Sequence, residues 1–505
     1  MKKNDYFEIE ITDMNSLGHG VGHFEGKAVF VAGAVTGEKI RAKVIKDGGS
    51  YYVARREELL YPSSFRREKS CDAFPACGGC AFCHIDYEYE KELKKRFVEG
   101  FLLKAGVEAK VLPLLSTEQT AGYRNKVQYP VREGKLGYYA SHSHRVVEKE
   151  GCALHHPAME PVIRTVADFI KKEQISCYEE ESGKGLLRHV YLRTNHDGSE
   201  MLLTLVINGE SLPKKDKLLS LLKDKHPSVT GVLLNINKKN TNVILGSDYI
   251  LLAGSETLTD SLLGCTFEMS PASFYQVNRR GAELLYTKVI EQAELTGDEV
   301  VADLFCGIGT IGLCLAKNAG VKELVGIEVI EQAVENAKKN AKRNGIENAS
   351  FYCADANHPA LQKADVVIVD PPRKGLEKEL IAHLTALSPK KIVYVSCDPA
   401  TLARDLALFH KDGWQIGKVQ PVDMFPRTGH VETVVLLSRE KADDHIRFSI
   451  NTEDLKKNVG GYATYGDIKA YVLEKFGLMV SSLYIAQTKD KCGIKERENY
   501  YIGEG

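Results

Sequence analysis

The sequence has no long hydrophobic run. None of its 505 residues lies in a stretch that approaches the ~20 consecutive apolar residues needed to cross a bilayer, so we expect no membrane partner. The N-terminus, Met1 to Tyr6, is followed by alternating acidic and apolar residues rather than by the apolar core of a signal peptide. These absences predict a cytoplasmic protein. Internal repeats and low-complexity tracts are also lacking, which gives no sign of a repeat architecture.

The sequence also lacks an excess of charge of either sign. It has 67 Lys and Arg against 68 Asp and Glu, a net charge of −1, so a polyanionic partner is not predicted from the whole chain. Any affinity for nucleic acid must come from local basic clusters. Taken alone, such clusters are more often solvated surface. The candidates are Arg55, Arg56, Arg66, Arg67 and Lys69, and then Arg124, Lys126, Arg132, Lys135 and Arg145.

The length predicts two to four domains. Short alternating strands with glycine turns near the N-terminus predict a small antiparallel barrel, and strands that alternate with helices after about residue 276 predict a doubly wound parallel sheet in an α/β fold. A mixed α+β region separates them. The expected organisation is a barrel at 1–60, a cysteine-rich segment at 61–90, the α+β domain at 91–275, the parallel sheet at 276–440 and a helical extension at 441–505.

A glycine-rich loop follows the predicted strand Val300 to Leu304. The segment Gly307-Ile308-Gly309-Thr310-Ile311-Gly312 satisfies the pattern G-x-G-x-x-G, which both dinucleotide and S-adenosylmethionine sites use. Glu328, at the end of the next strand, is placed to accept hydrogen bonds from ribose hydroxyls. Asp303 before the glycines suits a cationic sulfonium better than a pyrophosphate, and a second acidic strand end, Asp370, points the same way. The alternative for Asp370 is that it caps a helix.

Cys397 is the candidate nucleophile. It follows the predicted strand Ile392 to Val395 and precedes Pro399, a residue that is common in a first helical turn. Ligands bind at the carboxyl ends of parallel strands, and the N-terminus of a helix lowers the pKa of a nearby thiol. We therefore expect a reactive thiolate at this position. The alternative, that Cys397 is a small core residue, fits the other cysteines of this region better.

Four motifs in this order resemble those of the RNA uracil-5-methyltransferase family. They are Gly307-Ile308-Gly309, Asp370-Pro371-Pro372-Arg373-Lys374-Gly375, Ser396-Cys397-Asp398-Pro399 and Gly429-His430-Val431-Glu432-Thr433-Val434, and Phe274-Tyr275-Gln276-Val277-Asn278 matches the start of the family's catalytic domain. The resemblance covers about residues 1 to 440. It implies a class I, Rossmann-like methyltransferase domain and an N-terminal TRAM domain, which is an OB-like RNA-binding fold.

The resemblance also implies roles for individual residues. Gln276, Phe305, Glu328 and Asp370 would bind S-adenosylmethionine, Cys397 would attack carbon 6 of uracil, and Glu432 would remove the proton from carbon 5. The chemistry agrees, because carbon 5 is a poor nucleophile until a thiolate adds at carbon 6, and a base must then take the proton. The alternative for Glu432 is a surface residue of a strand.

Three of the twelve cysteines lie close together, Cys71, Cys77 and Cys80. Disulfides are not expected in a cytosolic chain, so this spacing indicates a bound metal. The resemblance supplies Cys152 as the fourth ligand. Four thiolates hold either zinc or a [4Fe–4S] cluster, and the resemblance favours a structural cluster. Cys83 departs from the family pattern and leaves the fourth ligand open.

The closest branch of the family pairs a TRAM domain with an iron–sulfur cluster and acts on 23S ribosomal RNA, so the expected partner is a loop of that RNA. A transfer RNA target remains an alternative, and the oligomeric state is open, with a monomer favoured. From other classes, a catalytically silent RNA-binding factor is opposed by the intact Cys397 and Glu432. A dehydrogenase leaves Cys397 without a role.

Overall fold

The computed structural model describes residues 1–439 except 142, 150 and 357, together with Lys469 and Leu473. The helical extension expected at 441–505 therefore lies outside the described residues, apart from those two positions. Among the helices that the structure describes, none is long and apolar enough to span a membrane.

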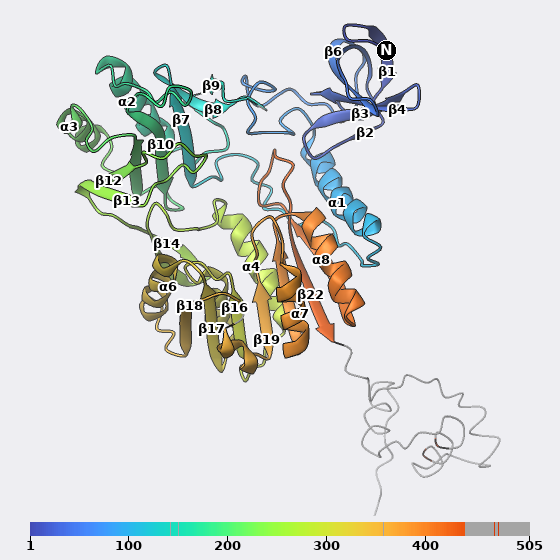
Figure 1. The fold of residues 1–505 in the computed structure, drawn as a ribbon, viewed down its shortest axis with the longest axis vertical. Coiled ribbons are helices and arrows are strands. Elements are labelled where there is room, and N and C mark those ends of the chain that lie inside the picture. The colour runs from blue at the N-terminus through green and yellow to red at the C-terminus, as the bar shows by residue number, and fades with distance from the viewer. Residues whose placement is uncertain (142, 150, 357, 440–468, 470–472, 474–505) are drawn as a thin grey trace, which may run out of the picture. The chain divides into compact units, whose positions relative to one another are not determined.

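The first six strands form one sheet with the order β1-β5-β6-β4-β3-β2 (Figure 1). Side chains alternate between buried and exposed along β1 and β5, as expected for strands with one covered face, and the covered face includes Ile9, Val29 and Ile40. The pairs are antiparallel except for β4 and β6, which run parallel. The strands are β1 (Tyr6–Glu10), β2 (Asp13–Met14), β3 (His19–Phe24), β4 (Lys27–Ala32), β5 (Lys39–Asp47) and β6 (Tyr51–Tyr61).

Helix α1 (Tyr87–Lys104) follows the cysteine-rich segment. Asp86 caps its N-terminus by accepting a hydrogen bond from the backbone N–H of Glu88, a common way to satisfy a free helix donor. Its buried face contains apolar residues such as Leu93 and Val98, and also two charged residues, Glu90 and Lys94. Buried charges of this kind require partners.

The central region is a seven-stranded mixed sheet with the order β13-β12-β11-β10-β7-β8-β9. Every residue of β10 and β11 is buried. Helices α2 (Met159–Lys172) and α3 (Lys215–Lys225) belong to its core. The strands are β7 (Lys126–Arg132), β8 (Lys135–Tyr139), β9 (Val146–Glu148), β10 (Leu187–Thr194), β11 (Met201–Ile207), β12 (Val229–Ile236) and β13 (Asp248–Gly254), and the hairpin β14 (Leu258–Leu262) and β15 (Cys265–Met269) follows.

The third sheet has the order β18-β17-β16-β19-β20-β22-β21, with five parallel strands and an antiparallel β22. Successive residues of its strands pack into two different cores, Val301 with α4, α5 and α6, and Ala302 with α1, α7 and α8. This is the doubly wound α/β sheet that the sequence predicts, with one antiparallel strand added. Its strands are β16 (Val300–Leu304), β17 (Glu323–Glu328), β18 (Ala349–Cys353), β19 (Val366–Val369), β20 (Lys391–Ser396), β21 (Trp414–Val422) and β22 (Glu432–Arg439).

The helices around this sheet are α4 (Arg279–Ala293), α5 (Thr310–Ala319), α6 (Glu331–Arg343), α7 (Lys378–Leu387) and α8 (Pro399–Lys411), with a 3-10 turn at Pro359–Lys363. Because β22 runs antiparallel to β20, its first residues lie beside the last residues of β20, and Thr433 pairs with Ser396. The carboxyl ends of the five parallel strands and the amino end of β22 therefore meet at one edge of the sheet.

Candidate active site

The glycine-rich loop connects β16 to α5. Phe305, Gly307 and Gly309 have φ values of 62°, 54° and 81°, so the chain here turns through left-handed conformations that glycine adopts without strain. Two acidic side chains hold the loop. The backbone N–H of Gly307 donates to Glu328 at 3.1 Å, and that of Gly312 donates to Asp303 at 2.9 Å. The strand end at Glu328 thus fixes the loop that a cofactor would contact.

The loop is electrostatically negative. Asp303 is buried, and its pKa rises to about 7 because of burial and the neighbouring carboxylates of Asp370 and Glu328. Burial likewise raises the pKa of Asp370, at the end of β19, to about 7. One oxygen of Asp303 has no hydrogen-bond partner. Three carboxyl groups this close to one another favour a positively charged ligand over a pyrophosphate.

Gln276 lies in the segment before α4, outside the sheet. It is buried, and its backbone carbonyl accepts a hydrogen bond from the side-chain amide of Asn125 at 3.0 Å. Asn278 then caps α4 by accepting a bond from the backbone N–H of Gly281. These contacts hold the backbone at Gln276, and its contact with the cofactor stays a prediction.

Cys397 lies between the last residue of β20 and the cap of α8. Asp398 accepts hydrogen bonds from the backbone N–H groups of Ala400 and Thr401 at 2.9 and 3.2 Å, and Ser396 is bonded to Thr433 of β22 at 3.2 Å. The first residue of β22, Glu432, is 4% exposed, so it is a buried strand residue and not a surface one. A thiol and a buried carboxyl group thus share the strand edge with the glycine loop.

The pKa values of these two groups are both raised. Burial raises the pKa of Glu432 to about 8, Asp370 adds to the effect, and Arg373 opposes it. Burial also raises the pKa of the Cys397 thiol to about 12, and the negative charges of Glu432 and Asp370 add to it. The lowered thiol pKa expected from the helix N-terminus is therefore wrong for the protein without ligands. The two carboxyl groups and the loss of water outweigh the helix dipole and Arg373.

Comparisons with known proteins identify this arrangement. A family model described as tRNA (uracil-5-)-methyltransferase matches residues 88–440, and a TRAM domain model matches residues 2–52.

The chain belongs to the tRNA (uracil-5-)-methyltransferase family.

Two relatives, from Clostridium acetobutylicum and Caldanaerobacter subterraneus, are each named an uncharacterized RNA methyltransferase. They are 42% and 41% identical over 453 and 450 residues, which cover 87% of this chain and 98% and 99% of theirs. The crystal structure of the Pyrococcus abyssi tRNA (uracil-54, C5)-methyltransferase in complex with S-adenosyl-L-homocysteine is also similar. It has 26% identity and a TM-score of 0.71, and the match covers 85% of this chain and all of that one.

Family membership makes this chain an S-adenosylmethionine-dependent RNA methyltransferase with an N-terminal TRAM domain. The dehydrogenase alternative, which the glycine pattern alone left open, is therefore wrong. The match covers the glycine loop, Asp370, Cys397 and Glu432, and the structure brings all four to one edge of the sheet. The TRAM domain also contacts the loop before Glu432. The backbone carbonyl of Ser16 lies so close to Gly429 that a Cβ at position 429 would overlap it.

Five cysteines of the methyltransferase's N-terminal half gather around one cavity of about 80 Å³. Its lining includes two basic residues, Arg124 and Lys149, and five cysteines: Cys71, Cys77, Cys80, Cys83 and Cys152. Cys80 and Cys83 are linked by a hydrogen bond between their thiols, which raises the pKa of Cys80 and lowers that of Cys83. As they stand, the thiols in the described part of the chain form no group that would hold a metal ion.

Arg373 and His430, two residues near Cys397, had no role predicted from the sequence. A terminal guanidinium nitrogen of Arg373 lies 3.1 Å from the ring nitrogens of His430, and the positive charge of Arg373 lowers the pKa of both Cys397 and Glu432. Both residues stood inside motifs quoted for the resemblance. Their position beside the catalytic residues in those motifs was the available signal.

The raised pKa of Glu432 predicts a pH-dependent effect of Glu432→Gln on stability. Below the ordinary pKa of about 4.5 the carboxyl group is neutral in both folded and unfolded chains, whereas above about 8 the folded protein must hold a buried charge. The stabilising contribution is thus present at low pH and is lost as pH rises through 8. We expect Glu432→Gln to stabilise the fold by a few kcal/mol at pH 9, since each pKa unit is worth about 1.4 kcal/mol.

Denaturant unfolding at pH 5 and pH 9 measures this difference. The exposed Glu347→Gln is the control and should leave the unfolding free energy unchanged at both pH values. Equal effects of Glu432→Gln at the two pH values would contradict the prediction.

Proposed function

We propose that this protein methylates carbon 5 of a uracil in a structured RNA, through a covalent bond to Cys397. The observation that carries the proposal is the register of β20 and β22, in which Thr433 faces Ser396. Cys397 and the buried Glu432 are next to each other in this pairing, which supports their roles as the proposed nucleophile and the proposed base. They share their edge of the sheet with the loop that would bind S-adenosylmethionine.

The cofactor would be held by Gln276, Phe305, Glu328 and Asp370, and it supplies an electrophilic methyl group on a positively charged sulfur. The carboxyl groups of Asp303, Glu328 and Asp370 fit that charge, because Glu328 and Asp370 are close enough to Asp303 to raise its pKa. A positive charge here would in turn favour the Cys397 thiolate, which in the protein alone is opposed by burial and by the carboxyl groups of Glu432 and Asp370.

The residues of the chain then act in two stages. The Cys397 thiolate would add to carbon 6 of uracil, and the electron pair of the carbon 5–carbon 6 double bond would move onto carbon 5. Carbon 5 would then bond the methyl group as the bond between that methyl group and the cofactor's sulfur breaks, and the sulfur would keep the electron pair as a neutral thioether. Glu432 next takes the proton from carbon 5, the double bond forms again, and the bond between carbon 6 and sulfur breaks to release the thiolate. The pKa of about 8 for Glu432 suits a base that works near neutral pH.

This mechanism predicts different effects of Cys397→Ala on chemistry and on binding. Methyl transfer should be abolished, while S-adenosylmethionine binding by calorimetry should be nearly unchanged, because Cys397 contacts the base and not the cofactor. RNA containing 5-fluorouridine should form a stable adduct with the wild type, since fluorine cannot leave as a cation.

The adduct is measured as a band that persists under denaturing electrophoresis, with Cys397→Ala as the control. An active wild-type enzyme that traps no fluorouridine RNA would overturn the covalent mechanism. A wild-type protein with no turnover on any RNA would instead favour a catalytically silent RNA-binding factor.

We propose 23S ribosomal RNA as the target, in a loop where carbon 6 of the uracil is accessible. A TRAM domain together with a cysteine cavity supports this choice. The similar Pyrococcus abyssi enzyme is named for a tRNA uracil, so transfer RNA is the second candidate. A deletion strain should lack 5-methyluridine at one or more positions of 23S RNA and keep it in transfer RNA. Loss from transfer RNA alone, restored by the wild type but not by Cys397→Ala, would reassign the substrate.

We also propose that Cys71, Cys77, Cys80 and Cys152 hold a [4Fe–4S] cluster of structural function. The four thiols line one cavity, and Arg124 and Lys149 on its wall would balance the negative charge of a thiolate-bound cluster. The cavity is lined by segments that precede and follow α1 in the sequence, so a bound cluster would link residues 71–83 to Cys152.

Anaerobically purified protein should contain about four iron and four sulfide per chain. Cys152→Ser should lose both, whereas the neighbouring Cys83→Ser, whose thiol lines the same cavity, should keep them. Stoichiometric zinc without sulfide would overturn the cluster, and loss on Cys83→Ser but not on Cys152→Ser would change the fourth ligand.

A further inference from the structure

The loop between β21 and β22, residues Asp423 to Val431, leads directly into Glu432. Four consecutive carbonyl oxygens of this loop each accept a hydrogen bond from a different segment of the chain. The Met424 carbonyl accepts from the side-chain amide of Asn278 at 3.0 Å, and the Phe425 carbonyl accepts from the Lys94 ammonium at 3.1 Å. The Pro426 carbonyl accepts from the Tyr123 hydroxyl at 2.9 Å. The Arg427 carbonyl accepts from the backbone N–H groups of Ala81 and Phe82 at 2.9 and 3.0 Å. The path of this loop is therefore set by its surroundings.

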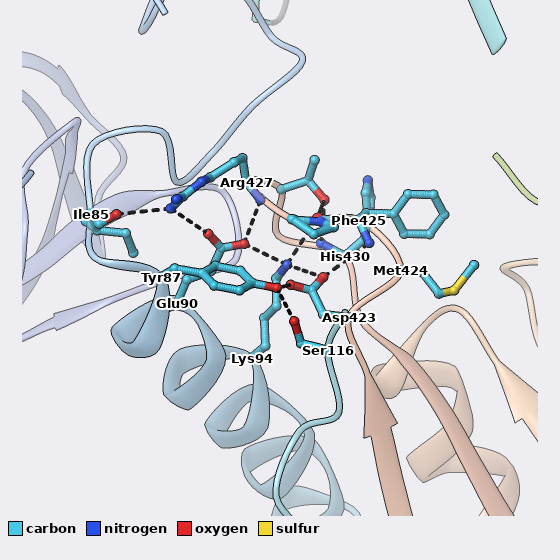
Figure 2. Close-up of polar contacts among 12 residues, drawn as sticks. Ile85, Tyr87, Glu90, Lys94, Ser116, Asp423, Met424, Phe425, Arg427 and His430 are labelled. Atoms are coloured by element: carbon cyan, nitrogen blue, oxygen red, sulfur yellow. Dashed lines mark hydrogen bonds and ion pairs between the residues drawn. The ribbon is translucent and has the colours of Figure 1, made fainter. Parts of the chain in front are cut away.

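A buried ion cluster holds the loop against α1 (Figure 2). The Lys94 ammonium lies 2.8 Å from Glu90 on its own helix and 2.8 Å from Asp423, which is 329 residues away in the sequence. All three side chains have no exposed surface. Tyr87 donates to the second oxygen of Asp423 at 2.8 Å. Lys94 thus bridges α1 to the first residue of the loop.

Glu90 holds the loop at a second point. It accepts a hydrogen bond from the backbone N–H of Arg427 at 2.7 Å, and the Arg427 guanidinium lies 3.3 Å from its other oxygen (Figure 2). Arg427 has a φ of 69°, which a side-chain-bearing residue adopts at a cost that neighbouring contacts must offset. The charges of two acidic residues, Glu90 and Asp423, and two basic residues, Lys94 and Arg427, therefore balance around this loop.

Such a cluster contributes little net stability, because the desolvation of the charges offsets their attraction and apolar replacements are often neutral. Its main effect is to define one position. The positioned loop ends at Glu432, and before that residue it carries His430, which is bonded to Arg373. Arg373 in turn acts on the charges of Cys397 and Glu432. A shift of the loop would move the base and its cationic neighbour together.

We infer that Lys94, with Glu90 and Asp423, is a positioning residue for the catalytic base, an inference that rests on the proposed role of Glu432. The base acts only after methyl transfer, on the proton of carbon 5. Loss of its position slows that last stage, while thiolate addition and methyl transfer continue. The methylated RNA then stays bound to Cys397, so a covalent protein–RNA complex accumulates on ordinary uridine.

Lys94→Met tests this, with Lys95→Met as the matched control. Lys95 forms the same kind of pair with a glutamate four residues on, Glu99 at 3.0 Å, but on the exposed side of α1. We expect turnover by Lys94→Met to fall about 10- to 100-fold, the range for a small misplacement of a catalytic group. Trapping of 5-fluorouridine RNA should change less than twofold, and a covalent complex with unmodified RNA should become visible on denaturing gels.

Lys94→Met leaves two buried carboxyl groups without their shared partner, and this can prevent folding. The double variant Lys94→Met/Glu90→Gln removes one charge of each sign and keeps the cluster neutral. It should show the same separation of turnover from trapping. Lys94→Arg, which keeps the charge, should recover part of the turnover.

The outcomes distinguish a failure of this inference from a failure of the proposed function. If both turnover and trapping fall in proportion in the folded double variant, or if it behaves like Lys95→Met, Lys94 does not position the base and the inference fails. If the wild type itself traps no fluorouridine RNA, the covalent mechanism fails.

Discussion

The antiparallel pairing of β22 with β20 is the constraint on which the chemistry of this protein depends. In an all-parallel sheet the carboxyl ends of the strands collect loops, but every strand begins at the opposite edge. The reversed β22 begins at the catalytic edge, where Thr433 faces Ser396. A side chain from the first residue of a strand, Glu432, is then as firmly held as one from the core, and it lies beside the residue that follows the end of β20.

The same geometry creates an electrostatic conflict. Asp370, Glu432 and Cys397 come from three neighbouring strands, and their burial makes each negative charge unfavourable to the others. Arg373 offsets only part of this. A site that raises the pKa of Cys397, its proposed nucleophile, in the absence of ligands is unsuited to nonspecific thiol reactions. The positive charge of the cofactor would complete the charge balance, so under the proposed mechanism reactivity is tied to occupancy of the site.

Local sequence was sufficient for the parts of this site that local structure creates. The strand Val300–Leu304 has the predicted bounds, because a short apolar run between turn residues specifies a buried strand. The glycine loop after it and the position of Pro399 in the first turn of α8 were predictable from local residue types. The pKa of Cys397 was predicted in the wrong direction, since the helix N-terminus is visible in the sequence while Glu432 and Asp370, which outweigh it, come from other strands.

Long-range polar contacts explain the rest of what the sequence did not reveal. Glu90 and Lys94 have the spacing of an ordinary exposed helical pair, four residues apart, and Lys95 with Glu99 repeats it. Only the fold shows that one pair is buried against Asp423 and the other is in water. In the cysteine-rich segment before α1, the backbone N–H groups of Ala81 and Phe82 donate hydrogen bonds to the carbonyl oxygen of Arg427. The loop before Glu432 is therefore held in large part by residues from the N-terminal fifth of the chain, so the placement of the proposed base depends on more of the described fold than its methyltransferase sheet.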